Sequence, residues 1–116
     1  PTVAYIEKYI FDDGEAIVTF TPTICSTRSA NRVPKDLVEE IRFDPASKIR
    51  LADINIPISK FKHSRESDAP VVEYYENDRN GLKIEVQKGY IIGIIFSVPQ
   101  NSALKCANTP KKLLDK

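Results

Sequence analysis

His63 is the single histidine of the chain, and it lies in a polar segment where catalytic chemistry would first be sought. Ser64 follows it directly and Asp68 lies nearby, so the segment holds the three residue types of a hydrolytic triad. A triad needs its nucleophile, base and orienting carboxylate in hydrogen-bond geometry, with donors for the oxyanion, and closeness in sequence does not supply this. The basic neighbours Lys62 and Arg65 indicate an exposed segment. We assign no catalytic residue, and one histidine with two distant cysteines is too small a set for a Cys/His zinc site.

A second polar segment has the opening rhythm of a calcium-binding loop. Glu76, Asp78 and Asn80 occupy alternate positions before Gly81. A calcium loop of the EF-hand type closes with a bidentate glutamate at its twelfth position, where this chain has Gln87, and it is flanked by helices, whereas these flanks have strand patterns. We interpret the segment as a polar hairpin connection without a metal; weak calcium binding through three oxygen ligands is the alternative.

Two further charged clusters are small. Paired carboxylates can perform acid–base work when burial separates their pKa values, but the acidic cluster falls at an expected hairpin tip, which is solvated. The basic cluster lies in a loop without the interleaved aromatic residues of a nucleic-acid platform, so contact with an acidic partner is the alternative to a plain solvated loop. The clusters are Asp12, Asp13 and Glu15, and Arg28, Arg32 and Lys35.

Composition and charge restrict the class of protein. The 116 residues are 41% hydrophobic and 28% charged, which is typical of a globular domain and too apolar for a disordered chain. The net charge of +1 provides no long-range field for nucleic acid or an anionic membrane. No apolar run reaches the roughly 20 residues that span a bilayer. We expect no cofactor, no nucleic acid, no transmembrane segment, a single domain over residues 1–107, and a tail or linker over residues 108–116.

Alternation of apolar and polar residues predicts a mainly β fold, an antiparallel sheet of about six strands built from hairpins and a C-terminal meander. An α+β fold is the alternative, because Pro57 can open a short helical turn and residues 35–44 suit either a helical turn or a strand. We favour a strand over Val38–Phe43. The alternation at Ile49 and Leu51 is soon lost, and residues 64–69 are expected to be a solvated loop. The other expected strands are residues 2–10, 15–23, 71–76, 82–87 and 90–98.

The last expected strand is apolar on both faces. Such a strand is central in a sheet and covered on each side, and we expect the turn over residues 57–62 or the N-terminal hairpin to cover the second face. The alternative is a face left for a partner chain. Adjacent tyrosines on a neighbouring strand point to opposite faces, so an exposed one can anchor a contact. One face carries Tyr90, Ile92, Ile94, Phe96 and Val98, and the candidate partner surface is Tyr74, Tyr75, Ile91 and Ile95.

Cys25 and Cys106 follow the second and the last expected strand. In a small exported domain two cysteines most often pair, and a bridge across most of the domain would stabilise it by roughly 4–5 kcal/mol in the chain-entropy model. The alternative is two separate reduced thiols in a cytosolic protein, since spacing does not establish Cα proximity. The chain starts at Pro1, which fits either removal of a signal peptide or a trimmed chain.

Three segments of the chain resemble small exported domains of unknown function from acidobacteria. They are NRVPKDLVEEIRFDP, KIRLADINIPISKFKHS and VEYYENDRNGLKIEVQKGYIIGI. The resemblance runs from Val33 to Cys106 and implies export and an oxidised Cys25–Cys106 pair, with no reaction and no catalytic residue. The turn ENDRNG is less acidic than in those domains and the last strand is more apolar, which favours a hydrophobic partner face.

These observations favour a non-enzymatic periplasmic or extracellular domain that binds a protein or cell-envelope partner. One alternative is a small hydrolase or ligand-processing domain that uses Asp and Ser residues from loops, and it requires a pocket with convergent polar groups. Another is a plain structural module of a larger exported protein.

Overall fold

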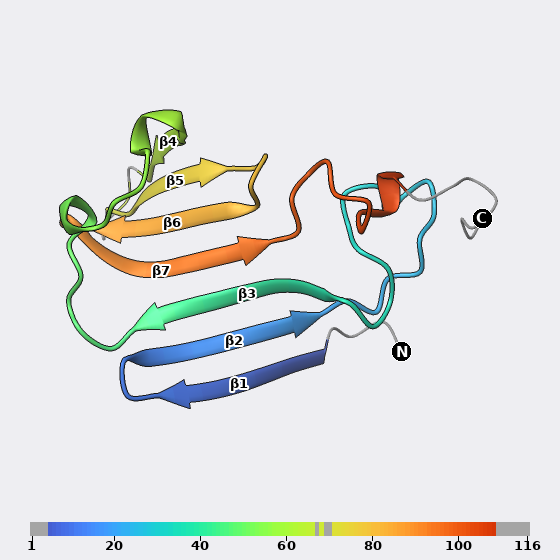
Figure 1. Cartoon of the computed structure of the whole chain (residues 1–116), viewed down its shortest axis with the longest axis horizontal. Helices are drawn as coiled ribbons and strands as arrows, with labels where there is room; N and C mark the ends of the chain where they lie inside the picture. The colour runs from blue at the N-terminus through green and yellow to red at the C-terminus, as the bar shows by residue number, and fades with distance from the viewer. Residues whose placement is uncertain (1–4, 67, 69–70, 109–116) are drawn as a thin grey trace.

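The computed structural model describes residues 5–66, 68 and 71–108, which form one seven-stranded antiparallel sheet (Figure 1). This confirms the mainly β prediction, and the described helical segments are three short 3-10 turns. Most of the predicted tail lies outside the described residues. The strands are β1 (Tyr5–Phe11), β2 (Gly14–Phe20), β3 (Val38–Pro45), β4 (Lys62–Arg65), β5 (Glu73–Asn77), β6 (Leu82–Gln87) and β7 (Tyr90–Ser97), and the turns are η1 (Leu51–Asp53), η2 (Ile58–Lys60) and η3 (Cys106–Asn108).

The sheet consists of two hairpin-built halves joined by one non-local pairing. Its order is β1-β2-β3-β7-β6-β5-β4, so β1 and β4 are the edges. The first half is closed by a tight turn that pairs Phe11 with Gly14, as the Asp-Asp-Gly signal predicts. The second half is a meander from β4 to β7, and Ile41 of β3 lies opposite Phe96 of β7. This pairing makes β7 a central strand, as its apolar sequence predicts.

A β-bulge changes which residues of β7 share a face. Ile94 lies opposite Ile84, and Gly93 lies opposite Glu85, but Ile91 and not Ile92 lies opposite Val86. The extra residue shifts the alternation by one position, because side chains on a strand have a period of two. The expected face of Tyr90, Ile92, Ile94 and Phe96 is therefore corrected: Ile91 joins Ile94 and Phe96, and Tyr90, opposite Gln87, lies on the other side.

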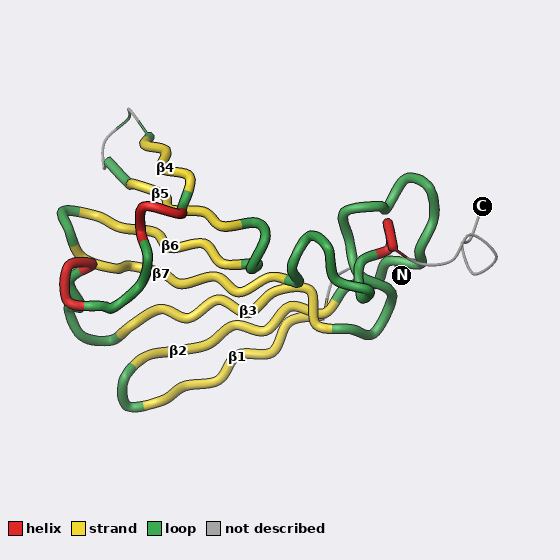
Figure 2. Tube along the Cα trace, turned by 45° about the horizontal axis from the view of Figure 1, so that its top comes forward, coloured by secondary structure: helices red, strands yellow, loops and turns green. Residues whose placement is uncertain are grey.

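The core covers only one end of one face. Ile84, Val86 and Ile91 are buried beneath the segment between β3 and β4, which contributes Ile49, Leu51, Ile54, Ile56 and Phe61. This segment carries η1 and η2, and it crosses β6 in Figure 2. The turn over residues 57–62 contributes Phe61 to this cover, but most of the cover comes from residues 49–56, and among the described residues it lies on one face of β7 and not on both as expected. The N-terminal hairpin instead extends the sheet sideways through β3.

Two local expectations are corrected. Ser64 and Arg65, expected to begin a solvated loop, instead complete the edge strand β4, which pairs with β5 from Lys62 opposite Glu76 to Arg65 opposite Glu73. The alternation at Ile49 and Leu51 does not become a strand of the sheet. It yields a single bridge between Arg50 and Tyr90 and then the turn η1. The described helical segments all lack the length and apolarity that a bilayer-spanning helix needs.

Candidate functional site

The most distinctive surface of the molecule is an apolar sheet face that nothing in the described chain covers. Residues paired directly across antiparallel strands point to the same face. Tyr5 pairs with Phe20, Phe20 with Val38, and Ile41 with Phe96, so one side of β1, β2, β3 and β7 is largely apolar, and Glu7 of β1, opposite Val18, interrupts it with a carboxylate. Six exposed side chains on this side define what we call the open face: Tyr5, Tyr9, Phe11, Val38, Ile41 and Phe96.

The open face is exposed to an extent unusual for large apolar side chains. Tyr5 is 62% exposed, Phe11 54% and Phe96 48%. The buried hydrophobic residues of the described chain all lie on β6, on β7 or near the disulfide, and β1, β2 and β3 have none. An aromatic side chain carries roughly 150–250 Å² of surface, so the four exposed aromatic residues present on the order of 400 Å². That equals the largest patch on a typical monomer, and such patches are often functional.

The opposite face is polar over β3, β7, β6 and β5, an area that we call the polar face, and an ion pair spans three of these strands. Arg42 of β3 reaches across β7 to Glu85 of β6, with 2.8 Å between Nη2 and Oε1, and its Nε lies 2.8 Å from Oδ1 of Asp44. The hydrogen bond to Glu85 is the main reason that the pKa of Arg42 is raised above its usual value. Gly93 of β7 lies directly beneath, and a Cβ there would be 2.5 Å from Nη2 of Arg42. The glycine in this apolar strand thus makes room for the ion pair.

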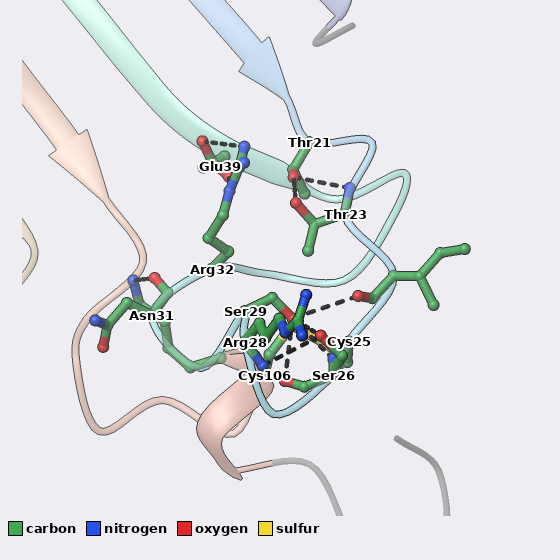
Figure 3. Close-up of a disulfide and its surroundings, with 12 residues drawn as sticks. Thr21, Thr23, Cys25, Ser26, Arg28, Ser29, Asn31, Arg32, Glu39 and Cys106 are labelled. Carbon is green, nitrogen blue, oxygen red and sulfur yellow. Dashed lines mark hydrogen bonds and ion pairs between the residues drawn. A yellow bond between two sulfur atoms is a disulfide. The ribbon is translucent and has the colours of Figure 1, made fainter. Parts of the chain in front are cut away.

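A disulfide between Cys25 and Cys106 closes the other end of the molecule (Figure 3). Their Cα atoms are 5.2 Å apart and both residues are buried, together with Val33. Backbone bonds run alongside, from the Cys106 amide to the Arg32 carbonyl at 2.7 Å and from the Ala107 amide to the Ala30 carbonyl at 2.9 Å. The expected bridge is present, and it joins the loop after β2 to the segment after β7.

The candidate partner surface predicted from the sequence is not brought together as an exposed patch. Ile91 is 4% exposed and belongs to the core, and Ile95 is 6% exposed on the polar face between Arg42 and Lys83. Tyr75 stacks on the ring of His63, with 4.6 Å between centroids. The sequence feature that could have indicated the open face is the repeated occurrence of aromatic residues along β1 and β2. Whether those side chains are exposed depends on which other segments pack over the sheet, and the sequence does not state this.

Tyr74 lies on the polar face, opposite Glu85. Its hydroxyl donates a hydrogen bond to Glu66, which raises its pKa to about 12. The Nζ atom of Lys83 lies 4.7 Å from the centroid of its ring. These contacts hold Tyr74 in a local polar network.

The residues considered for hydrolytic chemistry do not converge. Nε2 of His63 lies 3.2 Å from Oε1 of Glu73. Ser64 is the next residue along β4, so its side chain points to the opposite face. The described residues contain no group of three or more His, Cys, Asp or Glu side chains that could hold a metal ion. Asp78, from the calcium-like segment, uses its backbone carbonyl to accept hydrogen bonds from the amides of Gly81 and Gln100.

The charged clusters predicted from sequence are engaged in local contacts. Arg32 forms a two-pronged pair with Glu39, at 2.9 and 3.1 Å. Glu15 lies 3.3 Å from Lys8, and the Asp13 carbonyl accepts from the amide of Ala46. Arg28 binds through its backbone amide to Ser26.

A depression of about 590 Å³, partly open to solvent, lies between the polar face and the C-terminal loop. Its charged lining residues are Glu40, Glu76, Asp78, Lys83 and Lys105. The groups with a displaced pKa, namely Tyr9, Arg42 and Tyr74, do not line it. The depression therefore does not combine a pocket with the perturbed groups that mark catalytic sites.

Comparison of the chain with protein-family models, with curated proteins and with solved structures finds no match.

Proposed function

We propose that this chain is a non-enzymatic, exported domain that binds a protein or cell-envelope partner through its open face. The observation that carries the proposal is that β1, β2 and β3 have a largely apolar face, interrupted on β1 by Glu7, and not one fully buried apolar side chain. A face of this kind gains free energy when apolar surface is removed from water, at roughly 25 cal/mol per Å².

The exposed surface is large enough for a contact of useful strength. A standard protein interface buries about 800 Å² on each partner, and the aromatic residues of the open face supply on the order of half of that area. Phe96 and Ile41 are a cross-strand pair on β7 and β3, where the two halves of the sheet meet, and they link the open face of the first half to the second half. Tyrosine and phenylalanine anchors at the centre of an interface are typical of residues that dominate binding energy.

Export is supported by the disulfide. Cysteine pairs of this kind persist in oxidising compartments and are rare in the cytosol. Both cysteines of the chain are used in the bridge, so the fold as described corresponds to the oxidised protein. The resemblance to small exported domains points the same way. A plain structural role in a larger exported chain would use the same face to pack against a neighbouring domain.

The test is a comparison of three proteins as bait for envelope and secreted fractions: wild type, Phe96→Lys and Leu104→Lys. Phe96 is in the open face, whereas Leu104 is a similarly exposed apolar residue in the C-terminal loop. Any protein retained by the wild type is then purified and its Kd measured by calorimetry. We expect Phe96→Lys to weaken that Kd by at least ten-fold and Leu104→Lys to leave it unchanged. Equal Kd values for the three proteins would overturn the proposal.

A further inference from the structure

We propose that the edge strand β1 pairs with β1 of a second copy of this chain, antiparallel and about a two-fold axis at Lys8. The strand ends the sheet on one side, so one row of its backbone groups has no neighbouring strand among the described residues. Natural proteins usually protect such edges with charge, proline or a covering segment. Within Tyr5–Phe11 there is no proline, no described segment covers this edge, and the charged residues of the strand are Glu7 and Lys8.

Both charged residues of β1 have polar partners, a carboxylate for Lys8 and two tyrosine hydroxyls for Glu7. Nζ of Lys8 lies 3.3 Å from Oε2 of Glu15 on β2. Glu7 accepts hydrogen bonds from Tyr9 at 3.0 Å and from Tyr5 at 3.4 Å. Lysine protects an edge by bringing an unmatched charge to any incoming strand. Because Lys8 has its counter-charge beside it, its charge opposes an incoming strand less than that of an unpaired lysine would, and the other residues of the strand, Glu7 apart, are apolar or aromatic.

The strand is apolar on both faces, which is what an interior strand requires. Tyr5, Tyr9 and Phe11 lie on the open face, while Ile6 and Ile10 lie on the opposite face and are also exposed, Ile10 by 79%. A strand at the edge of a sheet would be solvated on these residues, whereas a strand between two others would have them packed against cross-strand partners. The sequence of β1 thus suits a strand with neighbours on both sides.

The strand is complementary to itself in one register. An antiparallel pairing that uses all seven residues of β1 sets Ile6 against Ile10 and Tyr5 against Phe11, each twice. It also sets the carboxylate of Glu7 against the hydroxyl-bearing Tyr9. Opposed residues share a face, so the open faces of both copies lie on the same side and merge into one. The dimer therefore doubles the surface offered to the partner of the proposed function, but its formation does not depend on that partner.

One contact in this register is unfavourable and makes the proposal specific. The two Lys8 residues lie opposite each other at the axis, and like charges in that position are destabilising. Replacing Lys8 with threonine, which favours strands, should tighten the dimer by up to about five-fold. A pairing in another register, or a contact through a different surface, gives no such gain. The paired strand is a small interface, so association is measured up to millimolar protein.

The experiment uses a thiol introduced at the axis. Because both natural cysteines are paired, K8C and K62C each carry one free thiol, and Lys62 supplies a matched lysine on the other edge strand, β4. Under mild oxidation we expect K8C to form a covalent dimer rapidly and K62C to remain monomeric. Sedimentation equilibrium should show the wild type as a weak dimer, K8T as a tighter one and I10K as a monomer, and I10K should retain its melting temperature because Ile10 is exposed.

A wild type that stays monomeric at millimolar concentration, or equal cross-linking of K8C and K62C, would overturn the inference. If the wild type is monomeric and I10K no longer binds the partner purified with the wild type, β1 instead pairs with a strand of a different protein. The Phe96→Lys variant separates the two proposals, because Phe96 is on β7 and not on β1. It should leave the dimer intact and weaken only the partner that covers the open face.

Discussion

The guanidinium of Arg42 lies 2.8 Å from the carboxylate of Glu85, and the strand that separates them passes beneath the pair at Gly93. Arg42 belongs to the N-terminal half of the sheet and Glu85 to the meander. The contact is thus one of the few side-chain bonds that hold the two halves in register.

We expect Glu85→Gln to lower the free energy of unfolding by about 1–3 kcal/mol, because it removes the charge from a partly buried hydrogen bond to a cation. The matched control is Glu15→Gln, which breaks the more exposed pair with Lys8 and should cost less than about 1 kcal/mol. Urea unfolding of both variants measures the difference. Equal losses of unfolding free energy in the two variants would mean that the Arg42–Glu85 pair stabilises the fold no more than the exposed Lys8–Glu15 pair.

Gly93→Val tests the Arg42–Glu85 contact by adding a side chain beneath it. A Cβ at position 93 would lie 3.1 Å from Oε1 of Glu85 and closer still to Arg42, so the pair must open to admit it. Although valine favours strands, we expect the variant to be less stable than the wild type in urea. Combination with Glu85→Gln should be less than additive, because both changes remove one interaction. An additive double variant would contradict this account.

The disulfide should contribute strongly to stability. We expect the double variant Cys25→Ala/Cys106→Ala to lose about 2–5 kcal/mol of unfolding free energy, because a bridge that closes a long loop restricts the unfolded chain. The melting temperature of the wild type with and without reductant gives the same comparison without mutation. Thiol titration before reduction should find none free, and an unchanged melt after complete reduction would oppose the prediction.

Gly81→Ala should be more damaging than Gly89→Ala. Both glycines have positive φ, +67° and +82°, so alanine at either site costs about 1–2 kcal/mol in backbone conformation. A Cβ on Gly81 would also collide with the carbonyl of Ser97, whereas the space around Gly89 is open. Thermal melts of the two variants isolate the cost of the collision, which should add to that of the conformation.

Tyr74 should ionise only at high pH. The hydrogen bond from its hydroxyl to Glu66 stabilises the neutral phenol and raises its pKa to about 12 from 10. The stabilising effect is complete below the pKa of the unfolded chain and is lost as the pH rises from 10 to 12. Ultraviolet titration should show one late tyrosinate that Tyr74→Phe removes and Glu66→Gln returns towards the normal range. If a tyrosinate with a high pKa persists in Tyr74→Phe, it belongs to another tyrosine. The candidate is Tyr9, whose pKa is raised by its hydrogen bond to Glu7.

Short-range features were predictable from the sequence. The turn at Lys88 and Gly89, both with positive φ, closes the β6–β7 hairpin. A Lys-Gly pair between two strand patterns predicts such a turn, because the turn depends on a few adjacent residues. The strand β4 was missed because the sequence KHSR has no apolar alternation, and its pairing with β5 is decided by contacts elsewhere.

The sequence placed the candidate partner surface partly on Ile91 and Ile95, which are buried in the structure. Sequence showed that β7 is apolar on both sides, but the burial of Ile91 depends on the segment around Leu51 and the bulge near Val86. Both depend on contacts between residues far apart in the sequence, and local hydrophobic periodicity does not predict such contacts. Phe96 is likewise exposed because the segment that covers Ile91 does not extend over it.

The disulfide also divides the chain into two parts that should respond differently to applied force. The covalent ring from Cys25 to Cys106 contains β3 to β7, while β1 and β2 lie outside it and are held by the pairing of β2 with β3. Tension applied at the N-terminal end should peel this hairpin away first, with a gain in extension of roughly 3.5 Å for each residue released. The rest of the sheet cannot be drawn out to its contour length until the sulfur–sulfur bond breaks. A hairpin that detaches while the ring stays closed is also the part of this protein most able to exchange between two copies.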